Sequence, residues 1–196
     1  MDLSSFDNSW YDPGRNLLVR ALWYYLGSPF FRWPGIPSSA LRRLLLRIFG
    51  AKVGRGVVIR NGVKVKYPWR LRVGDFAWIG EDCWIDNLAE VRIGSHVCIS
   101  QGAYLCTGNH DWTKETFDLI TRPIQIGDGA WVGAKSIICP GVTMGEASVA
   151  TAGSVITANV PPGQIWGGNP GRFIRLRECG SHRRQDAGAH SGLPRE

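Results

Sequence analysis

The sequence predicts an all-β fold, a parallel β-helix of six-residue repeats with a short helical N-terminal segment and one protruding loop. Three observations carry this prediction. Apolar residues recur at every sixth position over most of the chain, glycine often follows them, and one interval in the series is far too long. A period of six fits neither an α-helix nor the two-residue alternation of a hairpin strand. It fits a short strand and a tight corner, and three such units make one triangular coil that stacks on the next through parallel pairing, about 4.8 Å away.

The repeat consists of four series of apolar residues spaced six apart, with two-residue slips after Leu71 and after Val91. Their members are Val53, Ile59, Val65 and Leu71; Val73, Ile79, Ile85 and Val91; Ile93, Ile99 and Leu105; and Ile126, Val132, Ile138, Met144, Ala150 and Ile156. We expect each of these side chains to point into the core. The glycine that often follows gives a corner either a positive φ or room for a close approach.

Residues 1–50 precede the repeat and are predicted to form short helices with proline-rich breaks. Ser39 is the expected N-cap of an amphipathic helix that ends at Gly50. The segment mixes aromatic residues with arginines, namely Trp10, Trp23, Tyr24, Tyr25, Phe30, Phe31 and Trp33 with Arg20, Arg32, Arg42, Arg43 and Arg47. Two interpretations stay open, because such helices can cap the open end of the coil and can also contact a membrane surface with arginines facing the lipid.

The other domain boundaries follow from where the repeat stops. The β-helix domain is expected over residues 51–177, with an inserted loop over 109–122, because the 21 residues from Leu105 to Ile126 are not a multiple of six. Long insertions in a compact repeat are usually functional. Residues 178–196 are polar, contain Arg183, Arg184 and Arg195, and show no apolar period, so we expect a disordered tail.

Composition limits the partners and the location. The net charge of +7 suggests an anionic partner without choosing between nucleotide, membrane surface and nucleic acid. Nucleic acid is not expected, because the basic residues are not interleaved with exposed aromatics as in known binding modules. The five cysteines form no CxxC pair and no secretion signal opens the chain, so a cytoplasmic location is expected, with contact at the inner face of the membrane left open. No apolar run is long enough to span a bilayer.

His110 is the candidate for chemistry, because it lies where the coil passes into the inserted loop. An imidazole titrates near neutral pH and can act as a general base. The alternative is that His110 is merely an exposed loop histidine. A carbonyl or a carboxylate must fix the tautomer of a catalytic imidazole, and Asp111 is the carboxylate near enough in sequence.

Three motifs accompany the repeat, namely Thr107-Gly108-Asn109-His110-Asp111, the segment from Ile126 to Gly133, and the closing segments Ala152 to Ile156 and Gly168 to Arg172. Together they resemble the hexapeptide-repeat acetyltransferases. Residues 46–52, 67–69 and 104–108 are most similar to the colanic acid type found in exopolysaccharide clusters, and the resemblance covers about residues 15–177.

The resemblance implies a left-handed coil and a homotrimer with active sites between neighbouring protomers. It implies acetyl-CoA as co-substrate, no required metal, and a sugar acceptor such as an exopolysaccharide or lipid-linked glycan precursor. His110 would remove the proton of the acceptor hydroxyl. No serine or cysteine stands beside His110, so direct transfer is expected rather than an acyl-enzyme.

The resemblance also implies binding residues. Those for the coenzyme are Trp131, Ala134, Ala152, Thr157, Arg172 and Arg175. The acceptor-binding position of relatives falls on Asp86 or Asn87, because the slip before Ile93 blurs the match. A lysine of relatives is Ala158 here, so that phosphate contact is expected to be absent.

Three alternatives were weighed. A zinc hydrase on the same coil needs three histidines, but only His96 and His110 lie within the repeat. A non-catalytic scaffold would be marked by a lost histidine or a blocked coenzyme groove, whereas His110, Ala134 and Ala152 are present. Transfer to an amino sugar, or of another acyl group, keeps the same chemistry, and the sequence does not decide the acceptor.

Overall fold

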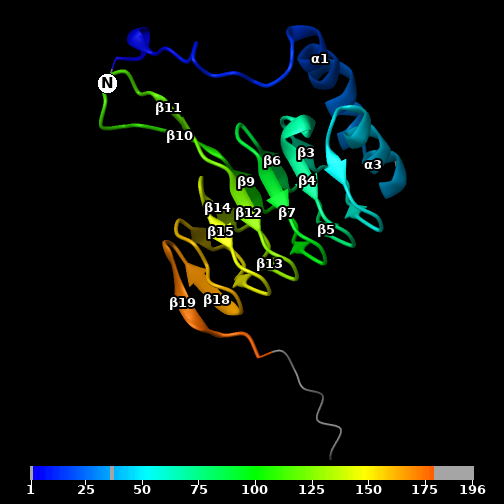
Figure 1. The fold of residues 1–196 in the computed structure, drawn as a ribbon, viewed down its shortest axis with the longest axis vertical. Coiled ribbons are helices and arrows are strands. Elements are labelled where there is room, and N and C mark those ends of the chain that lie inside the picture. Colours follow the sequence, from blue (N-terminus) through cyan, green and yellow to red (C-terminus); the bar gives the residue numbers. More distant parts are fainter. Residues whose placement is uncertain (1, 36–37, 179–196) are drawn as a thin grey trace, which may run out of the picture.

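The computed structural model describes residues 2–35 and 38–178 of the 196-residue chain and confirms the predicted β-helix (Figure 1). The tail prediction lies outside the described residues, apart from Glu178. Short strands wind into stacked coils whose sides form three sheets. Sheet A consists of β1 (Lys52–Val53), β4 (Leu71–Val73), β7 (Val91–Ile93), β12 (Ile124–Ile126) and β15 (Thr143–Met144).

Sheet B contains β2 (Val58–Ile59), β5 (Trp78–Ile79), β8 (Cys98–Ile99), β13 (Trp131–Val132), β16 (Val149–Ala150), β18 (Gln164–Gly168) and β19 (Gly171–Leu176). Sheet C contains β3 (Lys64–Val65), β6 (Trp84–Asp86), β9 (Tyr104–Cys106), β14 (Ile137–Ile138) and β17 (Val155–Ile156). All neighbours within these three sheets pair in parallel except β18 and β19, which form a closing hairpin.

The two-residue slips in the repeat fall on sheet A, which is the longer side of each coil. On β4, Leu71 and Val73 both point inward around an exposed Arg72, and β7 repeats this pattern with Val91 and Ile93. A three-residue strand therefore contributes two core side chains where the other sides contribute one. Fully burying a branched side chain of this size stabilises the fold by about 1.5–3 kcal/mol, so the repeat is held by its core.

The glycines that follow the inward residues serve close approach rather than a positive φ. A Cβ added to Gly133 would lie 2.5 Å from the backbone nitrogen of Ala152, and one on Gly145 would lie 2.5 Å from that of Pro162. Positive φ values fall two residues later, for example at Lys135. The stacking of one coil directly on the next is therefore what requires glycine at these positions.

Helices cap the first coil, as expected, and they consist of α1 (Leu17–Leu22), the π-helix η2 (Trp23–Gly27), α2 (Ser28–Arg32) and α3 (Ser39–Ile48). Ser38, rather than the predicted Ser39, caps α3 by accepting from the Leu41 amide. The Ser39 hydroxyl instead bonds the backbone of Ile59 on the first coil.

Arginines of α3 and one tryptophan donate hydrogen bonds to backbone carbonyls at the exposed edge of that coil. Arg47 donates to the Val53 carbonyl at 2.6 Å, and Arg43 donates to the Val57 carbonyl at 2.5 Å. The remaining edge contacts are those of Arg42 with the Ile59 carbonyl and of Trp23 Nε1 with the Val65 carbonyl. An unpaired strand edge would otherwise remain open to pairing with another chain. Three of the five arginines of these helices thus face the coil and not a lipid surface.

Residues 2–16, here called the N-terminal strap, do not take part in the cap. The strap contains the 3₁₀-helix η1 (Leu3–Ser5) and then runs extended from the inserted loop toward α1 (Figure 1). The Asp2 amide donates to the Glu115 carbonyl at 2.9 Å, and the Tyr11 hydroxyl donates to the Leu88 carbonyl at 2.7 Å. The strap therefore ties the loop to the coil. No described helix is long and apolar enough to cross a bilayer.

Candidate functional site

The inserted loop is a β-hairpin formed by β10 (Gly108–His110) and β11 (Leu119–Thr121). It leaves the coil at Thr107, whose buried hydroxyl donates to the Asp86 carbonyl at 2.9 Å and accepts from the Ala89 amide at 2.9 Å. The Arg122 amide then bonds the Thr107 carbonyl at 2.9 Å and closes the hairpin. The two hairpin strands run from Gly108 to Thr121, and the broken period predicted an inserted loop over residues 109–122.

The ring of His110 is oriented by the opposite strand end. Nδ1 lies 2.9 Å from the Phe117 carbonyl oxygen. A carbonyl only accepts, so Nδ1 must donate, and in the neutral imidazole Nε2 then carries the free lone pair. The Phe117 ring stacks on the imidazole with centroids 4.3 Å apart, and Phe6 of the strap packs at 5.6 Å. His110 is therefore held as an acceptor at Nε2, which a general base requires.

The expectation for Asp111 is wrong. Its carboxylate accepts from the Thr113 hydroxyl at 2.6 Å and from the Thr113 amide at 3.1 Å, and these bonds lower its pKa. The group that orients the imidazole is a backbone carbonyl seven residues after His110, on a residue with φ of 51°. Such a conformation in a bulky residue costs on the order of 1–3 kcal/mol and persists where its surroundings enforce it.

A cavity of about 590 Å³ lies beside His110. Its walls come from the strap, the hairpin and the first coils, and include Phe6, Tyr11, Lys66, Leu88 and His110. This size is within the range of small-molecule sites, about 300–1,000 Å³. The sequence alone did not indicate that the strap forms part of this cavity, since residues 2–16 lie far from the hairpin along the chain.

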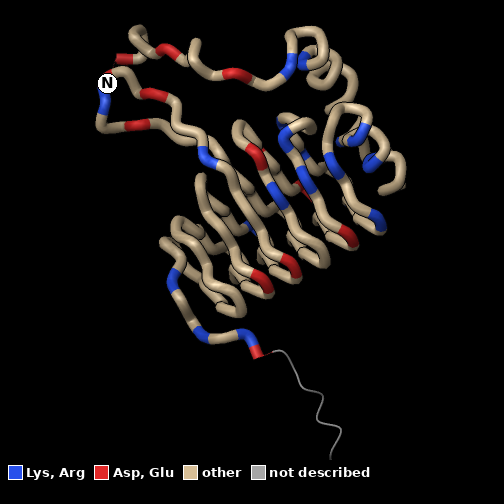
Figure 2. The backbone as a smooth tube through the Cα atoms, in the orientation of Figure 1, with Lys and Arg blue, Asp and Glu red and all other residues tan. Residues whose placement is uncertain are grey.

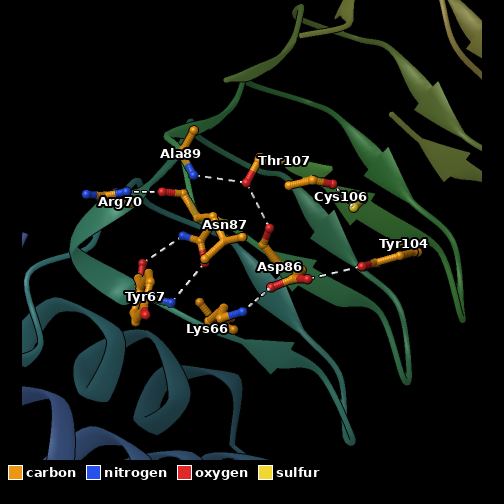
Figure 3. A network of polar contacts seen from close by, with 12 residues as sticks. Lys66, Tyr67, Arg70, Asp86, Asn87, Ala89, Tyr104, Cys106 and Thr107 are labelled. Atoms are coloured by element: carbon orange, nitrogen blue, oxygen red, sulfur yellow. Dashed lines mark hydrogen bonds and ion pairs between the residues drawn. The ribbon is translucent and has the colours of Figure 1, made fainter. Parts of the chain in front are cut away.

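Asp86 and Asn87 sit on the coil below the hairpin and have different surroundings (Figure 3). Asn87 is fully buried, its amide donating to the Tyr67 carbonyl at 2.7 Å while its oxygen accepts from the Tyr67 amide at 2.9 Å. Asp86 accepts from the Tyr104 hydroxyl at 3.1 Å, and Lys66 Nζ lies 3.1 Å from its other oxygen. Asp86 lines a cavity, whereas the side chain of Asn87 is fully buried.

Tyr104 supports that carboxylate as a neutral donor. Burial of its hydroxyl, followed by the neighbouring Cys106 and Asp86, raises the pKa of Tyr104. The phenol therefore keeps its proton at neutral pH and continues to donate to Asp86.

The residues expected at a coenzyme lie toward the other end of the coil. Ala134 and Ala152 follow β13 and β16 and stack on successive turns, since the Gly153 amide donates to the Ala134 carbonyl at 2.8 Å. Trp131 is 47% exposed, with Nε1 donating to the Ser100 hydroxyl at 2.9 Å. The remaining members of the set are exposed, namely Thr157 after β17 and Arg172 and Arg175 on β19.

His110 and this set are separated within one chain. The hairpin points away from β18 and β19 (Figure 1), and no hydrogen bond in the described part of the chain joins His110 to the set. Among residues 2–35 and 38–178 no group of three or more histidine, cysteine or acidic side chains is placed to hold a metal ion. His96, the other repeat histidine, stacks on Phe76 at a corner.

Comparison with known proteins identifies the family to which this architecture belongs. Residues 123–158 match the family model of the hexapeptide repeat of succinyl-transferase. WcaF of Escherichia coli, named as a colanic acid biosynthesis acetyltransferase, is 40% identical over 176 residues, which make up 90% of this chain and 97% of WcaF. Galactoside O-acetyltransferase of E. coli is 32% identical over 143 residues, 71% of this chain and 70% of that enzyme.

A solved structure agrees with these relatives. A hexapeptide-repeat acetyltransferase of Vibrio cholerae, crystallised with acetyl coenzyme A, superposes with a TM-score of 0.74 at 26% identity. The match covers 82% of this chain and 88% of that one. The repeat, the fold and the relatives that match over most of their length agree. The chain therefore belongs to the hexapeptide-repeat acetyltransferases.

Proposed function

We propose that the protein transfers an acetyl group from acetyl-CoA to a sugar hydroxyl, with His110 as the general base. The observation that carries this proposal is the bond from Nδ1 to the Phe117 carbonyl, which leaves Nε2 free to accept a proton beside a cavity. The family to which the chain belongs, and the acetyl coenzyme A bound by the Vibrio relative, support the choice of donor.

The chemistry follows from a hydroxyl being a poor nucleophile. Nε2 of His110 takes the hydroxyl proton while the oxygen attacks the thioester carbonyl carbon. The tetrahedral intermediate collapses, the carbon–sulfur bond breaks, and the proton passes to the coenzyme thiolate. The products are an acetyl ester and free coenzyme A. A positioned imidazole contributes about 10²–10⁴-fold to such a step.

The coenzyme is proposed to lie along Trp131, Ala134 and Ala152, where the coils stack closely. Thr157, Arg172 and Arg175 would bind its phosphorylated end, because guanidinium groups match phosphate geometry with two parallel bonds. Neither arginine forms an ion pair within residues 2–35 and 38–178. Both are therefore available to a ligand.

A homotrimer is proposed, because it would bring a hairpin of one protomer to the coenzyme set of the next. The outward rows of the sheets differ in a way that supports association. On sheet A the row is polar, with Lys52, Arg72, Arg92, Gln125 and Thr143 in register. On sheet B it is largely apolar, with Val58, Trp78, Cys98, Trp131, Val149 and Ile165. Trp78 and Trp131 of this row are 45% and 47% exposed, and large apolar side chains exposed on one face are the kind that a partner covers.

Contact with a membrane through the N-terminal helices is also proposed. The helices expose large apolar side chains, among them Leu17, Leu18, Tyr24, Tyr25, Leu26, Trp33 and Ile48. Arg20 and Arg32 are the arginines of this segment that the cap does not use. Aromatic and basic side chains together on short helices are typical of interfacial binding.

The proposal is tested by incubating the protein with acetyl-CoA and a panel of glycans, with product detection by mass spectrometry. An added acetyl group that alkali removes identifies an ester, whereas one resistant to alkali identifies transfer to an amine. Transfer that depends on His110 supports the proposal. Acetylation at the same rate by His110→Ala contradicts it.

A further inference from the structure

A second cavity, of about 530 Å³, adjoins the cavity beside His110. The two cavities share Arg20, Lys66 and Tyr67 in their walls, so they lie side by side between the hairpin and the N-terminal helices. Together they exceed what a single small ligand requires. An acceptor whose hydroxyl meets His110 can therefore extend into the second cavity, here called the helix-side cavity.

The helix-side cavity is strongly cationic. Its walls carry four basic side chains, Arg20, Arg32, Lys64 and Lys66, against a single carboxylate, Asp86. Lys66 pairs with Asp86 at 3.1 Å. Within residues 2–35 and 38–178, no acidic side chain pairs with the other three. Figure 2 shows Lys and Arg gathered over the helices and the first coils.

These cations contrast with the arginines of α3 in the same region. Arg42, Arg43 and Arg47 are committed to backbone carbonyls at the edge of the first coil. The guanidinium groups of Arg20 and Arg32 make no hydrogen bond among the described residues and instead border the cavity. Capping the coil therefore does not account for them.

The floor of the helix-side cavity is built for a polar ring. Trp84 is 42% exposed and stacks on Tyr104 with centroids 4.7 Å apart, while Lys64 lies over its other side at 5.6 Å. Asp86 is 9% exposed, and its Oδ1 lacks a hydrogen bond of proper geometry despite the nearby Lys66. The Lys66 ammonium lies 3.1 Å from this oxygen, and a carboxylate oxygen can accept a second bond, so a ligand hydroxyl can donate to it.

We propose that the acceptor is an anionic glycan whose carboxylate or phosphate binds in the helix-side cavity, on Arg20, Lys64 and Arg32. A sugar ring lies against the exposed edge of Trp84 and donates a hydroxyl to Asp86, and the hydroxyl to be acetylated reaches His110 in the adjoining cavity. Bonds between charged groups are worth about twice those between neutral ones, so the anion supplies much of the acceptor affinity. This inference rests on the proposed acetyl transfer.

The test compares matched acceptors that differ in charge. Methyl glucoside, methyl glucuronide and glucose 1-phosphate are assayed with acetyl-CoA, and kcat/KM is measured for each. We expect kcat/KM for the better of the two charged acceptors to exceed that for the neutral one by about tenfold, since bonds to charged groups are stronger than neutral ones and solvent screening reduces the gain. Comparison of glucuronide with phosphate tells which anion the cavity takes.

Arg20→Gln combined with Lys64→Gln should bring the ratio of charged to neutral kcat/KM close to one. The matched control is Lys52→Gln, which removes an exposed charge from sheet A and should leave the ratio unchanged. Turnover with a ratio near one in the wild-type protein, or a ratio that the double variant does not change, overturns the anionic acceptor and leaves acetyl transfer standing.

A binding measurement separates this inference from the proposed function. If no probe is acetylated, the proposed transfer to these sugars is wrong. Calorimetric titration of His110→Ala with the same three probes then tests whether the helix-side cavity binds an anion. Tighter binding of a charged probe than of methyl glucoside, lost in the double variant, supports the cavity. Equal binding of charged and neutral probes refutes it.

Discussion

Replacing His110 by phenylalanine tests the catalytic assignment with little disturbance of the hairpin. The phenyl ring keeps the stack on Phe117, which is 4.3 Å away between centroids, and removes only the two nitrogens. The lost bond from Nδ1 to the Phe117 carbonyl costs about 0.5–1.5 kcal/mol of local stability. Loss of the base at Nε2 should lower kcat by about 10²–10⁴-fold, or about 2.7–5.4 kcal/mol in the barrier.

The assay is initial-rate release of free coenzyme A, with acceptor and acetyl-CoA varied separately. The KM for acetyl-CoA should change little, because the proposed coenzyme residues lie on other elements. Trp112→Ala is the matched control, since Trp112 is 75% exposed on the same hairpin and should leave kcat unchanged. A His110→Phe protein within about threefold of wild-type kcat, or one changed only in KM, would refute the assignment.

Four other variants or measurements test the remaining structure. Arg172→Gln with Arg175→Gln should raise the KM for acetyl-CoA more than it lowers kcat, and unchanged coenzyme affinity in a direct titration would count against that site. Arg42→Met should lower the free energy of unfolding by about 3–5 kcal/mol in a denaturant titration, because Arg42 is 2% exposed and its loss leaves edge carbonyls and Asn61 unpaired. The control is Arg55→Met, which removes one partner of an exposed ion pair. Light scattering at micromolar concentration should give about three times the chain mass of 21.7 kDa, and a monomer would exclude the shared active site. Full-length protein should co-sediment with anionic vesicles at low salt and less at high salt, whereas a chain beginning near Ala51 should not; full-length protein that stays in the supernatant would exclude membrane contact.

The repeat made the fold predictable in detail. An apolar residue at every sixth position indicated which side chains enter the core, and the interval from Leu105 to Ile126 predicted an inserted loop, which the structure shows to be a β-hairpin. The glycines were less informative. Their position was clear from the sequence, but only the stacked coils show that a Cβ at Gly133 would collide with the next turn.

The site was predictable in its residue types and not in its partners. His110 could be selected from its place at the start of the insertion, whereas the carbonyl that orients it belongs to Phe117, and every residue carries a carbonyl. Asp86 and Asn87 were both candidates in the sequence, and Asp86 was the preferred one. The structure distinguishes them, because the side chain of Asn87 bonds the backbone of Tyr67 and that of Asp86 borders the cavity.

By itself the sequence determined the architecture, the hairpin and the candidate base, because each depends on residues close together along the chain or on a period that repeats. Only the tertiary structure decided that the N-terminal strap closes over His110, that three arginines cap the coil, and that Arg20 and Lys64 border one cavity. Those contacts join residues far apart in the chain, and no local preference encodes them. Their geometry exists only once the coils have stacked and the helices have docked on them.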